Sequence, residues 1–118
     1  MKPYLIGIIL SMSSSMAVAN QKTMECSMQG VKESLILSIP KEGLPEINFF
    51  YPVKTKIFSM HAGNFLLVIL DKDDSTRTRL VISAQFDKHK KVYTGQMMAD
   101  WGGNQLQIDN GPVTCKLR

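Results

Sequence analysis

The stretch that decides the fold covers residues 78–86 and reads Thr78-Arg79-Leu80-Val81-Ile82-Ser83-Ala84-Gln85-Phe86. Successive side chains of a β-strand point to opposite faces of a sheet, so Leu80, Ile82, Ala84 and Phe86 share one face. That face is apolar, whereas the opposite face is largely polar. The alternation predicts a strand that has one side in a hydrophobic core and the other toward water.

Turn-forming residues recur along the rest of the chain at similar intervals. They stand at 29–30, 40–45, 51–52, 61–64, 71–75, 87–91, 100–104 and 109–112. No apolar run at helical period lies between them, which favours an antiparallel meander of short strands. We place nine strands, at 23–28, 31–39, 47–51, 54–59, 65–70, 76–86, 92–99, 105–109 and 113–117.

The run Phe65–Leu70 is apolar on both faces. A strand of this kind must be covered on both sides. We expect the barrel interior to cover one side, and another segment, the chain ends or a partner to cover the other.

The chain has two cysteines, Cys26 and Cys115, and each falls on the apolar face of a predicted strand. We predict a disulfide that joins the first strand to the last and so brings the sheet toward a closed barrel. Such a bridge closes a loop of about 90 residues, for which the chain-entropy model gives roughly 4.5 kcal/mol.

Residues 1–19 have the order of a secretory signal peptide. Lys2 provides a positive start, an apolar run follows, and Ala17 and Ala19 fit the peptidase positions. The apolar run is too short to span a bilayer. We expect cleavage after Ala19, and a product from Asn20 to Arg118 that has no transmembrane segment and works in a periplasm or outside the cell, where a disulfide persists.

Length and composition agree with one small exported domain. The chain has 118 residues, 44% of them hydrophobic, and a formal net charge of +4, which is only mildly basic. We expect residues 20–118 to form a single all-β domain of about eight or nine strands, either a small antiparallel barrel or a barrel-like sandwich.

Two turns are candidate binding sites. Lys88-His89-Lys90-Lys91 is the densest positive run, which suits either a solvated turn or contact with an anionic envelope component. Trp101, the only tryptophan, stands before two glycines and is either a plug over a barrel end or an anchor for a protein or an apolar ligand. Nucleic acid is not expected, because aromatic residues are not interleaved with the basic ones.

Other chemical patterns are incomplete. Asp71–Ser75 resembles the start of a calcium loop, but Thr76 and Ile82 replace its later glycine and glutamate, so a hairpin turn is the better interpretation. Neither His61 nor His89 stands in a catalytic or zinc motif, although Ser59 could meet His61 in space. A cuprous site is conceivable from five residues in two short stretches of the sequence: Met60, His61, Met97, Met98 and Trp101.

Export, a small β domain and the lack of a catalytic motif together favour a non-catalytic binding module without a cofactor. The layout is similar in outline to small periplasmic inhibitor and carrier barrels. The expected partner is a protein or an anionic envelope component. A carrier of an apolar ligand or copper ion, and an enzyme of unknown type, are the alternatives; the oligomeric state stays open.

Overall fold

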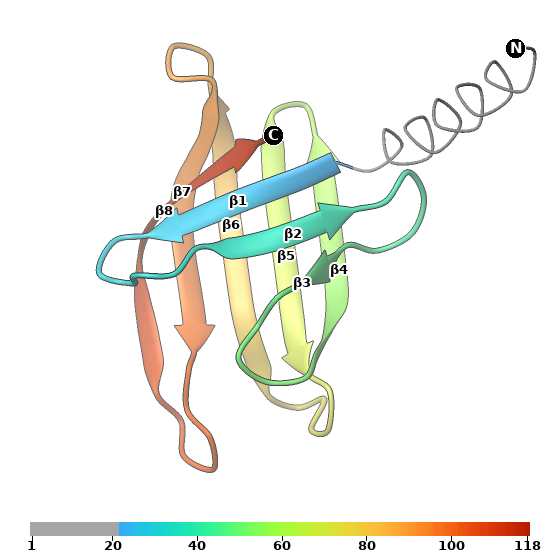
Figure 1. Cartoon of the computed structure of the whole chain (residues 1–118), viewed down its shortest axis with the longest axis vertical. Coiled ribbons are helices and arrows are strands. Elements are labelled where there is room, and N and C mark those ends of the chain that lie inside the picture. The colour runs from blue at the N-terminus through green and yellow to red at the C-terminus, as the bar shows by residue number, and fades with distance from the viewer. Residues whose placement is uncertain (1–21) are drawn as a thin grey trace, which may run out of the picture.

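Eight antiparallel strands make one curved sheet in the computed structural model, which describes residues 22–118 (Figure 1). They are β1 (Lys22–Met28), β2 (Leu35–Ile39), β3 (Glu46–Ile47), β4 (Val53–His61), β5 (Asn64–Asp71), β6 (Thr78–Asp87), β7 (Val92–Asp100) and β8 (Ile108–Leu117). Their order in the sheet is β3-β2-β1-β8-β7-β6-β5-β4. Strands β1 to β3 cross in front of the longer strands, and the sheet forms a nearly closed barrel.

The predicted disulfide is confirmed, and it joins β1 to β8. Cys26 and Cys115 lie directly opposite each other in the ladder, with their Cα atoms 4.0 Å apart. The barrel closes elsewhere, because β2 and β3 continue the sheet beyond β1. The seam falls between β3 and β4, where the Thr55 hydroxyl donates a 2.7 Å hydrogen bond to the Pro45 carbonyl.

The core lies on the inner face and follows the alternation expected for residues 78–86. Leu80, Ile82 and Ala84 are buried, whereas Phe86 is 42% exposed because it stands at the end of β6, where the barrel opens. Both cysteines are buried among the same side chains. Burial of apolar surface, at about 25 cal/mol per Å², supplies the main driving force for this arrangement.

Three predicted elements differ from the observed ones. The strand predicted at 31–39 begins only at Leu35, and that at 47–51 shrinks to β3. The turn predicted at 109–112 is wrong, since the strands expected at 105–109 and 113–117 are one strand, β8. Pro112 is tolerated there because β1 pairs with β8 only from Val113 onward, so this half of β8 is an edge.

The second face of β5 is only partly covered. Leu66 is 37% exposed, and Val68 lies in register between Ile57 and Val81 on the neighbouring strands. Within residues 22–118 no other segment of the sheet packs over this outer face, so the covering segment expected from the sequence is not found there. The outer face of β4 to β7 thus carries an apolar row.

The predicted signal peptide, residues 1–19, and the cleavage site after Ala19 lie outside the described residues. Within the described part of the chain, no helix has the length and apolar character needed to cross a membrane.

Candidate functional site

Four aromatic side chains gather at one end of the barrel. Phe49, Phe50 and Tyr51 lie just before β4, and Trp101 follows β7. The ring of Phe49 stacks on the indole at 5.4 Å between centroids, and Phe50 meets the indole edge-on at 5.3 Å. Such pairs add to the stability that area burial already provides. The cluster therefore fixes the position of Trp101 at the barrel end.

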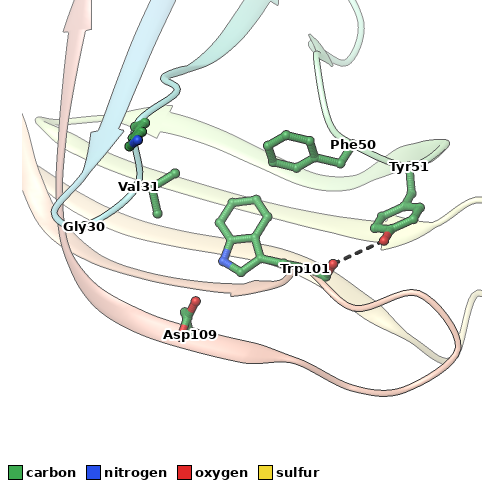
Figure 2. A pocket seen from close by; sticks show the side chains of 7 residues that line it. Gly30, Val31, Phe50, Tyr51, Trp101 and Asp109 are labelled. Atoms are coloured by element: carbon green, nitrogen blue, oxygen red, sulfur yellow. Dashed lines mark hydrogen bonds between the residues drawn. The ribbon is translucent and has the colours of Figure 1, made fainter.

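A pocket of about 450 Å³ opens beside this cluster (Figure 2). Its walls come from four separate parts of the chain, and the lining residues are Gly30, Val31, Lys32, Phe50, Tyr51, Trp101 and Asp109. Phe50 is 56% exposed, so most of its ring is open to solvent or to a ligand. Lys32 and Asp109 provide opposite charges on an otherwise mainly apolar wall.

The indole N–H of Trp101 is buried, and residues 22–118 offer it no hydrogen-bond partner. In Figure 2 the nitrogen points to the side of the pocket where Val31 and Asp109 lie. Buried donors in native proteins are nearly always satisfied. The pocket wall thus contains one buried donor that residues 22–118 leave unsatisfied, beside the charged groups of Lys32 and Asp109.

The loop that carries Trp101 is held by Asp100, whose side chain is 1% exposed. One carboxylate oxygen accepts a 2.7 Å hydrogen bond from Arg77 Nε, and the other accepts the N–H groups of Gly102 and Gln107, each at 3.0 Å. The Arg77 guanidinium also donates to three carbonyls in the segment 102–105. This ion pair holds the pKa of Asp100 far below its usual range and fixes both ends of the loop.

A second arginine stands beneath Tyr51. The register of β5 and β6 slips next to Ile69, which leaves Arg79 without a partner on β5, and bulges of this kind redirect side chains. Arg79 is buried, donates to Asp71 at 2.8 Å, and places its guanidinium carbon 4.3 Å from the centre of the Tyr51 ring. Its hydrogen bond lowers the pKa of Asp71, and the cation supports one wall of the pocket.

Trp101 combines the two roles that the sequence left open. Its indole packs against the hydrophobic core, as a plug would, and it also lines the pocket, as an anchor would. The basic turn lies at the other end of β7, where Lys88, His89, Lys90 and Lys91 are all exposed. The two candidate sites are therefore separate, as expected for turns at opposite ends of one strand.

The other sequence patterns do not converge on a site. The strand register places His61 level with Thr94 on β7. Thr94 lies seven residues from Trp101, which corresponds to about 23 Å at ~3.3 Å per residue. The five candidate copper ligands therefore do not form one cluster. Asp71 accepts backbone N–H groups of its own turn, which agrees with a hairpin. Among residues 22–118 no group of three His, Cys, Asp or Glu could hold a metal ion.

Sequence reasoning missed most of the pocket. The run Phe49-Phe50-Tyr51 was expected inside a strand, although three adjacent aromatic side chains cannot share one face of a strand, and the Pro52 that follows also favours a loop. No sequence pattern pointed to Arg79 as a residue that supports the pocket, because only the bulge directs its side chain to the barrel end.

Comparisons with protein-family models, with curated proteins and with solved structures find no significant match. We therefore argue function from the geometry of the pocket.

Proposed function

We propose that this chain is an exported, non-catalytic binding module that takes an apolar, planar group of its ligand into the pocket beside Trp101. The observation that carries this proposal is the aromatic pocket lined by Phe50, Tyr51 and Trp101, beside which the buried indole N–H has no partner within residues 22–118. A ligand group with a flat apolar body and one hydrogen-bond acceptor, such as an aryl amide or carboxylate, would complement both features.

The size and composition of the pocket support ligand binding. Its volume of about 450 Å³ lies within the usual range for small-molecule sites. Aromatic side chains are also the commonest anchors in protein interfaces. The same walls would thus suit either a small molecule or one aromatic side chain of a protein partner.

The support behind the pocket favours a preformed site. Asp100 and Arg77 fix the loop of Trp101, and Arg79 braces Tyr51. Because these groups are ordered before a ligand arrives, little conformational entropy would be lost on binding. The ionisable side chains that line the pocket are Lys32, Tyr51 and Asp109. The Tyr51 hydroxyl donates to the Trp101 carbonyl, and these three do not form the nucleophile and base pair that covalent catalysis needs.

Because the chain has a single tryptophan, its one indole N–H resonance reports directly on the pocket. We would titrate the mature protein with benzamide, benzoate and cyclohexanecarboxamide and follow that resonance by NMR. The expected result is a saturable downfield shift for the two aromatic compounds, since an accepted hydrogen bond deshields the proton. Native mass spectrometry of protein purified from its own compartment would then show any natural ligand as an adduct.

Phe50→Ala should weaken binding about tenfold, because an aromatic contact adds about 1.5 kcal/mol at most beyond burial. Phe86→Ala is the matched control, since Phe86 is similarly exposed but stands at the opposite end of the barrel. Equal effects of the two substitutions, or binding that leaves the indole resonance unmoved, would overturn the proposal.

A further inference from the structure

The two ends of the barrel differ in charge. The turn after β6 lies beside the end of β8, because Tyr93 pairs with Cys115. Five basic and two acidic side chains stand at this end, which we call the basic end: Lys88, Lys90, Lys91, Lys116, Arg118, Glu25 and Asp87. The end that carries the aromatic pocket has equal numbers, five basic and five acidic side chains: Lys32, Lys54, Lys72, Arg77, Arg79, Asp71, Asp73, Asp74, Asp100 and Asp109. The net positive charge of these two ends is therefore concentrated at the basic end.

The positive charges at the basic end are available to a partner. Both acidic groups there are engaged: Asp87 accepts the backbone N–H groups of His89 and Lys90, and Glu25 pairs with Arg118 at 2.6 Å. Within the described part of the chain, Lys88, Lys90 and Lys91 form no salt bridge. Three lysines thus project from one hairpin with their charge uncompensated.

An exposed aromatic ring stands next to these lysines. Phe86 directly precedes the turn, is 42% exposed and packs one side on Tyr93 at 5.2 Å. Leu117, at the end of β8, is also exposed. The β6–β7 hairpin projects beyond the barrel in Figure 1, so this end is convex. A convex tip with lysines around an apolar side chain suits a flat anionic surface into which a ring can insert.

We infer that the basic end docks on an anionic lipid surface, with the lysines at the phosphate groups and Phe86 at the acyl boundary. This inference goes beyond the ligand site proposed above and does not depend on it. The uneven charge orients the domain, because the anionic surface attracts the basic end and not the balanced pocket end. The aromatic pocket then faces the aqueous space, where a ligand can reach it.

The test is co-sedimentation of the mature protein with vesicles of phosphatidylcholine and phosphatidylglycerol, compared with vesicles of phosphatidylcholine alone. We expect binding to the anionic vesicles that falls as salt rises. The triple variant Lys88→Gln, Lys90→Gln, Lys91→Gln should lose about 100-fold in affinity, at about fivefold for each lysine. Phe86→Ser should weaken binding but leave its salt dependence unchanged.

The matched control removes three exposed lysines elsewhere, with Lys41→Gln, Lys54→Gln and Lys72→Gln. Both triple variants have the same net charge, so equal losses would mean attraction by net charge alone and would overturn the inference. Binding to heparin that survives without binding to vesicles would also overturn it, in favour of a soluble polyanion. Circular dichroism confirms that each variant is folded before its affinity is compared.

Discussion

Replacing Asp100 tests how the Trp101 loop is held. In Asp100→Ala the Arg77 guanidinium loses its carboxylate, and two backbone N–H groups lose their acceptor. Breaking a buried pair in this way costs about 3 to 5 kcal/mol, a large part of the ~5 to 15 kcal/mol that stabilises a typical domain. Asp100→Asn keeps an oxygen for the two N–H groups but loses the charge and the acceptor for Arg77 Nε, so we expect a smaller cost of about 1.5 to 3 kcal/mol.

The pH dependence separates this charge effect from a simple loss of packing. Because the pKa of Asp100 is lowered in the folded chain, the unfolded chain binds the extra proton first as the pH falls. The stabilisation is complete above the ordinary aspartate pKa of about 4 and is lost progressively in more acidic solution. Asp100→Asn should therefore show a shallower loss of stability below about pH 5.

The assay is urea unfolding followed in parallel by Trp101 fluorescence and far-ultraviolet circular dichroism, for both variants and the parent chain between neutral and acidic pH. The indole reports on the loop and the dichroism reports on the sheet. An Asp100→Asn protein within about 0.5 kcal/mol of the parent, the range of ordinary surface substitutions, with the same acid sensitivity, would refute the reasoning.

Three further outcomes follow from the fold. Replacing Cys26 and Cys115 by alanine should lower the unfolding free energy by up to about 4.5 kcal/mol, measured by urea titration without reductant, and a change below about 1 kcal/mol would contradict the loop-closure account. Ala62→Asn should raise the melting temperature, because Ala62 has a φ of 52° and asparagine tolerates that conformation better than alanine, by roughly 0.5 to 1 kcal/mol. An unchanged melting temperature would show that the turn is unstrained. Gly95→Ala should cost about 1 to 3 kcal/mol in the same titration, because an added Cβ would overlap the Ser83 carbonyl, and an unchanged midpoint would show that the strands can shift.

The alternation of apolar and polar residues predicted strand positions well for strands that lie between two long strands in the sheet. The bounds of β5, β6 and β7 fall within two residues of the expected ones, and the inward positions of Leu80, Ile82 and Cys115 are as predicted. These features depend on the two-residue alternation of side chains along a strand, which neighbouring residues in the sequence determine.

The pocket could not be predicted in the same way, because its walls depend on contacts between distant segments. Arg79 reaches the barrel end only through a bulge, and Phe50 meets Trp101 only because the chain before β4 crosses the end of β7. Asn110-Gly111-Pro112 predicted a turn from its local composition, but the edge position in β8 outweighs that preference. Of the residues that line the pocket, only Trp101 was a candidate binding residue in the sequence, because it is the one tryptophan and stands before two glycines.

The pairing of β1 with β8 also sets the order in which the molecule can assemble. Strands β4 to β8 join neighbours in sequence, so each can add to the previous one as a hairpin forms, and local pairings of this kind are fast. The hairpin of β1 and β2 joins this sheet only through β8, whose cysteine follows Cys26 by 89 residues. We therefore expect oxidation of the two thiols to come late and to lock a barrel whose β4–β8 sheet has already formed.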